Sequence, residues 1–160
     1  MKIWRILNSL EHLEDRMASL YETGRLLYAM DPDVASFFAQ MRDEELGHRD
    51  LVRYQQRILL RAPENYADLP DYDEAGLGQA ERAAEELIGR VAQLALAELL
   101  DAAVALECAA TEQHYRSVLG QASPALGMLV AQLGDSDQAH AAKLARFARA
   151  HGVDPSSRAA

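Results

Sequence analysis

The sequence predicts an all-α protein: an antiparallel four-helix bundle with a long crossover between helices 2 and 3, built from two duplicated helical hairpins. Three observations predict this fold. Apolar residues recur at the spacing of amphipathic helices along nearly the whole chain. A carboxylate followed three residues later by histidine occurs twice, as Glu45 with His48 and as Asp137 with His140. These two pairs lie 92 positions apart, and the residues around them also match, which is typical of a repeated unit.

The composition fits one soluble domain. The chain has 160 residues, of which 49% are apolar and 26% charged. We expect residues 1–150 to form the bundle and 151–160 a flexible tail. The net charge of -9 argues against binding to nucleic acid or to an anionic membrane. A single cysteine excludes an intramolecular disulfide framework. We see no signal peptide and no apolar run near the ~20 residues that span a bilayer, so we expect a cytoplasmic protein.

The first expected helix reaches Met30. Its inner stripe is mostly apolar and comprises Ile3, Leu7, Leu10, Met17, Tyr21, Gly24 and Tyr28. Glu14 takes one place in this stripe, where the pattern calls for an apolar side chain. The tripeptide Asp31-Pro32-Asp33 ends the helix, and Asp33 is expected to cap the next one.

The second expected helix runs to Leu60 or Arg61 and is ended by Pro63. Its inner stripe contains Glu45 and His48 among apolar or uncharged residues: Val34, Phe38, Met41, Val52, Gln55 and Leu59. Because only a short turn joins the first two helices, they must lie antiparallel.

The segment 62–78 is rich in Pro, Asp and Gly, and we interpret it as a crossover that lets helix 3 run parallel to helix 2. A short helix is expected from Gln79 to Arg90, either separate from helix 3 or merged with it. Helix 3 ends between Gly120 and Pro124, and its inner stripe is Leu96, Leu100, Ala103, Glu107, Ala110 and His114. The inner stripe of helix 4 is Leu126, Val130, Leu133, Asp137, His140, Leu144 and Phe147.

Six polar residues fall on the four inner stripes at mid-helix: Glu14, Glu45, His48, Glu107, Asp137 and His140. A charged carboxylate in a helical core costs several kcal/mol unless it is paired or bound to metal. Two divalent cations would neutralise four carboxylates, and the imidazoles would complete the coordination. These six residues therefore predict a dimetal site, which is also the predicted reactive site. Two iron ions are expected, with manganese or zinc as alternatives.

Each of these residues alone has a simpler interpretation. A lone buried glutamate usually pairs with a base, and a lone histidine is usually a hydrogen-bonded core residue. Asp137 is shorter than glutamate by a methylene, so binding to a single metal, or through water, stays open. Tyr21 and His114 each lie seven residues after a helix glutamate, about 10 Å along the axis. They are candidates for hydrogen bonds to the ligands or for plain core packing.

Two further side chains are expected to have no role in the site. Glu44 is assigned to a solvated helix face. Cys108 is assigned to the core as a small residue.

The segment Glu44-Glu45-Leu46-Gly47-His48 and the pair Glu14 with Tyr21 resemble the rubrerythrin branch of the ferritin-like superfamily. The resemblance implies a di-iron site that reacts with hydrogen peroxide or dioxygen. It also implies an external electron donor, such as a rubredoxin-type protein, because the paired Cys-x-x-Cys motifs of full rubrerythrins are missing. Small bundles of this kind often dimerise, so we expect a homodimer.

Two positions differ from that family. Ala110 stands where an extra carboxylate is usual, and Asp137 stands where glutamate is usual. Two other functions therefore stay open. One is an iron-handling module without turnover, and the other is an interaction protein whose site has degenerated.

Overall fold

A computed structural model describes residues 2–66, 75–108 and 119–153, with only the backbone described at 75–78, 80 and 137. The described part is all-helical and contains no strand. Its helices are α1 (Lys2–Leu27), α2 (Pro32–Arg61), α3 (Ala75–Arg90), α4 (Leu96–Cys108) and α6 (Pro124–Ala150). Two single 3-10 turns, η1 (Pro63–Asn65) and η2 (Val91–Gln93), follow α2 and α3. The all-α prediction is confirmed, and no helix in the described ranges has the length and apolar character to cross a membrane.

The turn between α1 and α2 differs from the predicted one. The first helix ends at Leu27 instead of Met30, and the N-cap of α2 is Asp31 instead of Asp33. The Asp31 side chain accepts a hydrogen bond from the backbone N–H of Val34 at 3.2 Å. Pro32 fixes this start, because a proline at the first helical position has no N–H that would be left unpaired.

Helix α6 begins in the same way as α2. Ser123 is its N-cap and accepts from the backbone N–H of Leu126 at 3.2 Å, and Pro124 occupies the first turn. Ser123 and Pro124 follow Asp31 and Pro32 by the same 92 positions that separate the two carboxylate–histidine pairs. The repeated register therefore extends to the capping hydrogen bonds.

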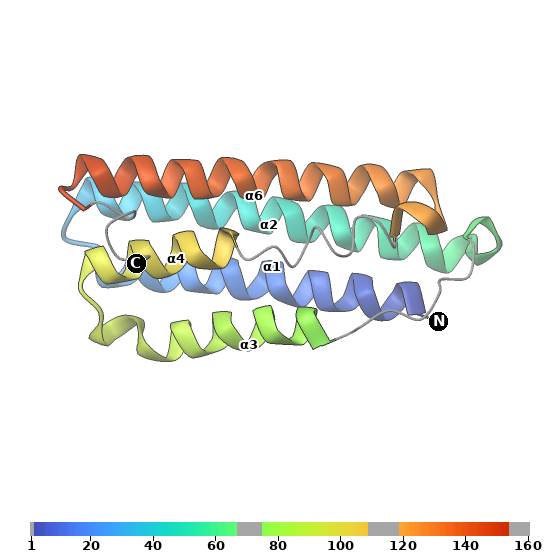
Figure 1. Ribbon diagram of the computed structural model, residues 1–160, viewed down its shortest axis with the longest axis horizontal. Helices are drawn as coiled ribbons and strands as arrows, with labels where there is room; N and C mark the ends of the chain where they lie inside the picture. Colours follow the sequence, from blue (N-terminus) through green and yellow to red (C-terminus); the bar gives the residue numbers. More distant parts are fainter. Residues whose placement is uncertain (1, 67–74, 109–118, 154–160) are drawn as a thin grey trace.

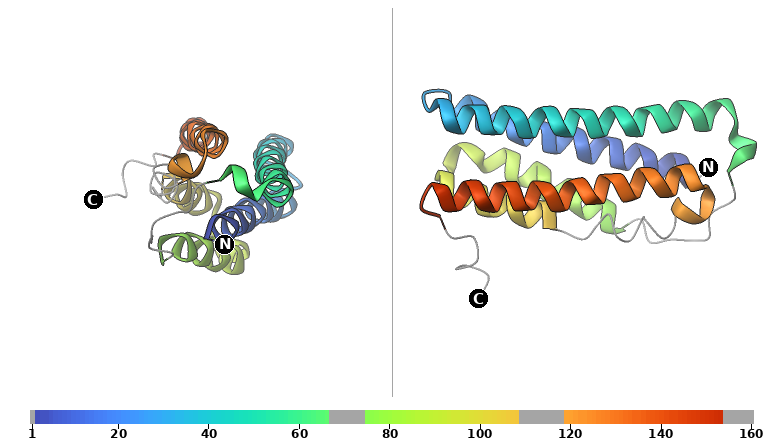
Figure 2. Two further views of the ribbon diagram at one scale, coloured as in Figure 1. Left: turned by 90° about the vertical axis from the view of Figure 1, so that its right-hand side faces the viewer. Right: turned by 90° about the horizontal axis from the view of Figure 1, so that it is seen from above.

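The helices lie alongside one another, as Figure 1 shows. Helices α1 and α2 run in opposite directions, as do α4 and α6, while α4 runs in the same direction as α2. Helix α3 makes the return path and packs against α1, outside the other helices when they are viewed end-on (Figure 2). It does not merge with α4, because the α-helical conformation is interrupted by the 3-10 turn η2 and by the extended residue Leu94.

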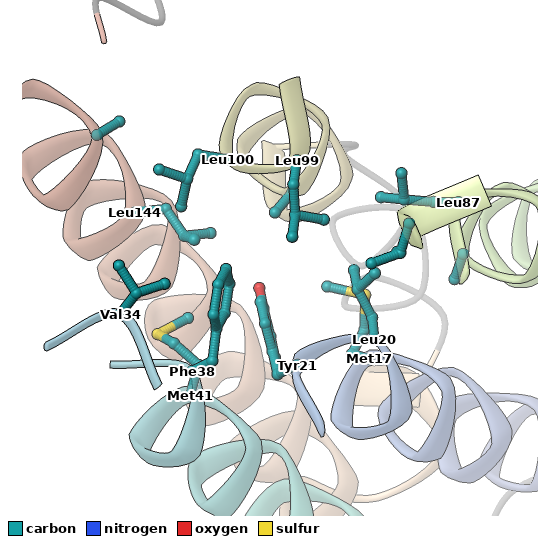
Figure 3. Packing of buried hydrophobic residues seen from close by; sticks show 14 of the residues in the cluster. Met17, Leu20, Tyr21, Val34, Phe38, Met41, Leu87, Leu99, Leu100 and Leu144 are labelled. Atoms are coloured by element: carbon teal, nitrogen blue, oxygen red, sulfur yellow. The ribbon is translucent and has the colours of Figure 1, made fainter. Parts of the chain in front are cut away.

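Two hydrophobic clusters make up the core of the described part. Figure 3 shows the first, which contains Met17, Tyr21, Phe38, Leu100 and Leu144 among others. The second lies toward the other end of the helices, and its members are Ile3, Ile6, Leu7, Leu10, Val52, Leu59, Leu119, Ala122, Leu126, Leu129, Val130 and Leu133.

Within the ranges that the structure describes, three helices, α1, α2 and α6, contribute to both clusters. On α2 the buried Glu45 and His48 stand between the apolar residues of the two clusters, as does the buried His140 on α6. At the far end of α2 the buried glutamine is Gln56, one position after the predicted Gln55, and its amide donates to Glu11 on α1.

Candidate metal centre

Five of the six predicted ligands meet in the layer between the two clusters. Glu14 comes from α1, Glu45 and His48 from α2, Glu107 from α4 and His140 from α6. Their side chains are buried, since the exposed fraction is 2% or 3% for the carboxylates and His140, and 11% for His48. The sixth ligand, Asp137, lies on α6, but its side chain is outside the described residues, and so is the whole of His114.

Glu45 lies between the two histidines. Its Oε2 is 3.2 Å from Nδ1 of His48, and its Oε1 is 2.9 Å from Nδ1 of His140. The two imidazole rings are stacked, with centroids 5.1 Å apart. Ligand atoms of these three residues all lie within 4.8 Å of one another, so the group could hold a metal ion.

The contact between Glu45 and His140 has a feature that fits a bound cation. Oε1 of Glu45 and Nδ1 of His140 are both buried, and within the described ranges neither forms a hydrogen bond despite their separation of 2.9 Å. Leaving buried polar atoms unpaired costs free energy. Atoms that face each other without hydrogen-bond alignment can instead share a common ligand, and oxygen with imidazole nitrogen is a donor set that suits iron, manganese or zinc.

The other two carboxylates lie on either side of this group. Oε2 of Glu14 is 3.5 Å from Nδ1 of His48, and Oε1 of Glu107 is 3.7 Å from Nδ1 of His140. The hydroxyl of Tyr21, which is fully buried, donates to Oε1 of Glu107. Tyr21 thus both packs in the core and holds a carboxylate of the site.

Burial acts differently on the three carboxylates. It raises the pKa of Glu14 well above its usual range and that of Glu107 to about 7, and nearby histidines only partly offset it. Burial also acts on Glu45, but the two neighbouring histidines, His140 and His48, outweigh it and lower the pKa of Glu45 to about 2. Glu45 is therefore the member of the three that stays ionised most readily.

Burial and neighbouring charges shift the pKa of a histidine in the directions opposite to those for a carboxylate. Burial alone would lower the pKa of each ring, but the surrounding carboxylates raise that of His48 to about 10 and that of His140 to about 11. Without metal, protons on the two rings thus balance negative charge in this layer. Because only an unprotonated imidazole nitrogen can coordinate, metal binding would displace these protons.

Glu44 contacts the predicted site, although its place in the sequence predicted a solvated helix face. Its Oε2 is 2.8 Å from Nε2 of His140, and its side chain is only 29% exposed. Lys143 donates to its Oε1 at 2.6 Å and Gln40 at 3.0 Å. The available sequence signals were the Gln40–Glu44 spacing of four and the His140–Lys143 spacing of three, which place each pair on one helix face.

The expectation for Cys108 was wrong, because this side chain is exposed. Cys108 directly follows Glu107 on α4, and one residue turns a helix by about 100°. When Glu107 points into the site, its neighbour therefore points away from it.

Comparison of the chain with protein-family models, with curated proteins and with solved structures finds no match.

Proposed function

We propose that this protein is a ferritin-like dimetal carboxylate protein that binds two iron ions and reacts with hydrogen peroxide or dioxygen, using electrons from an external donor. The observation that carries the proposal is the position of Glu45. It is buried and ionised between two histidines, and one of its oxygens faces a histidine nitrogen without a hydrogen bond. A pair of cations is the simplest partner for such a group, given three buried carboxylates in the same layer.

The helix arrangement supports the ferritin-like part of the proposal. Helices α1 with α2 and α4 with α6 form two hairpins whose second helices share one capping pattern at a separation of 92 positions. We propose that these two hairpins constitute a four-helix bundle with a long crossover, and that α3 is part of this crossover. In such a bundle, inward glutamates and Glu-x-x-His pairs hold the metals.

Each residue has a role in this scheme. Glu14 and His48 would hold one ion, and Glu107, Asp137 and His140 the other, with Glu45 shared between them. Bound ferrous ions would supply the two electrons that cleave an O–O bond. The two hydrophobic clusters exclude bulk water from both sides of the layer, and Tyr21 orients Glu107 through its hydroxyl. A small oxidant would approach beside His48, the most exposed of the five described ligands.

A second candidate is metal handling without turnover. It is favoured by the described ligand group of Glu45, His48 and His140, which has the size and donor number of a single-ion site. Asp137 would then be too short to complete the second position.

The decisive experiment is metal content per chain, measured on protein purified without chelators and then reconstituted with ferrous iron. We expect two iron ions per chain and reoxidation of the ferrous protein by peroxide. As a control, Glu85→Gln removes only the half-exposed surface pair with Arg16 and should leave the metal content unchanged. One ion per chain without peroxide reactivity would favour metal handling, and no bound metal in a folded protein would refute both functions.

A further inference from the structure

His140 contacts a carboxylate at each of its two ring nitrogens. Nδ1 faces Glu45 inside the layer, at 2.9 Å, and Nε2 faces Glu44 on the outer side, at 2.8 Å. A histidine that binds a metal through one nitrogen usually donates its other N–H to a carboxylate, a carbonyl or water. The distance and the side of the ring match this arrangement.

From this geometry we infer that Glu44 is a positioning residue for the metal centre. It accepts the Nε2–H of His140, fixes the ring orientation and keeps the Nδ1 lone pair directed at the metal position. The inference rests on the proposed function, because a metal must occupy that position for the orientation to matter. It adds a residue outside the predicted ligand set.

The surroundings of Glu44 suit this role. Lys143 contacts both of its carboxylate oxygens and Gln40 donates to one of them, so the carboxylate is held from two further directions. The carboxylate is therefore held in place as an acceptor. Lys143 lies one helical turn after His140, so α6 carries both the ring and the cation that holds its partner.

The repeat does not provide the same arrangement for His48. At a separation of 92 positions, Glu44 corresponds to Ser136 and Lys143 corresponds to Leu51. A serine supplies no carboxylate and a leucine no cation. The two histidines are thus predicted to differ in how firmly they are oriented.

The test measures zinc affinity of the full-length protein by competition with a chromophoric chelator. Zinc is diamagnetic and suits the same nitrogen and oxygen donors. We expect Glu44→Ala to weaken zinc binding about 10- to 100-fold, the range typical for loss of such a partner. Lys143→Met should weaken it less, because Glu44 remains, and Glu85→Gln should not change it.

A spectroscopic readout separates positioning from a general loss of stability. In zinc-loaded protein labelled with 15N at histidine, the Nε2–H of His140 should give a slowly exchanging signal that is lost in Glu44→Ala. Glu44→Gln keeps an acceptor oxygen and should retain the signal. Unchanged affinity and an unchanged signal in Glu44→Ala would overturn the inference alone, whereas no zinc binding by the wild-type protein would overturn the proposed function with it.

Discussion

The two hairpins share one register but differ in how they complete the site. In the first hairpin, His48 contacts Glu14 of α1 and Glu45 of α2, so both carboxylates belong to the same hairpin as the histidine. In the second, His140 contacts Glu107 of α4, but its two shorter carboxylate contacts come from Glu45 and Glu44 of α2. A repeat can thus preserve positions while contacts diverge, and here α2 serves both halves.

The largest expected difference is between Glu45→Ala and Asp137→Ala, which alter equivalent positions. Glu45 faces both histidines, so its loss should abolish binding of both metals. Asp137→Ala should remove at most the ion of the second half. Metal content per chain measures both, and circular dichroism checks that the helices persist. Equal losses in the two variants would contradict the asymmetry described here.

Replacement of Glu14 or of Glu107 should change the stability of the metal-free protein to different extents. A carboxyl whose folded pKa is raised destabilises the fold once the pH exceeds its unfolded value. At pH 7 we expect Glu14→Gln to stabilise the metal-free protein, and Glu107→Gln to stabilise it less, because the pKa of Glu107 rises only to about 7. Thermal unfolding of the chelator-treated protein at pH 7 and pH 4 tests this, since the gain should vanish at pH 4.

The capping residues should behave alike in both hairpins. Asp31→Ala and Ser123→Ala each remove a side-chain acceptor from the third backbone N–H of a long helix. We expect each to cost about 1 kcal/mol of unfolding free energy. Urea denaturation measures both. A loss of unfolding free energy in only one of the two variants would show that the two equivalent caps do not contribute equally to stability.

The smallest expected effect concerns an ion-pair network that only the first hairpin can form. Glu22 on α1 accepts from Arg25 and from Arg42 on α2, which lower its pKa to about 2. Arg42 corresponds to Gly134 in the repeat. Since the pKa of Glu22 is lower in the folded protein than in the unfolded one, the stabilisation from this network is fully present above about pH 4.5. It is lost as the pH falls toward 2. Glu22→Gln should cost only ~0.5–1 kcal/mol at pH 7, because the pair is partly exposed, and nothing near pH 2.

The sequence predicted the features that depend on local periodicity. The all-α class, the end of α2 at Arg61 and the end of α3 at Arg90 are confirmed, but α3 begins at Ala75 instead of the predicted Gln79. The cap at Asp31 was missed because two aspartates flank Pro32, and only the backbone geometry shows which of them precedes the first turn.

Five predicted ligands converge because inner stripes of neighbouring helices must face one another. Glu44 could not be found in the same way. Its role depends on a contact with His140, which is far away in the sequence, and on the rotation of α2 relative to α6. A helix periodicity specifies which residues share a face, but it does not specify how two faces are rotated against each other.

The division of the core has a consequence for cooperativity. Helices α1, α2 and α6 pass through both hydrophobic clusters, whereas among the described side chains α3 contributes only to the first and residues 119–122 only to the second. Either end of the molecule can therefore open while the other still holds the same three helices. We expect amide hydrogen exchange to resolve two units, one at each end of the molecule, that differ in protection. A ligand bound in the polar layer between them would make the two units unfold together.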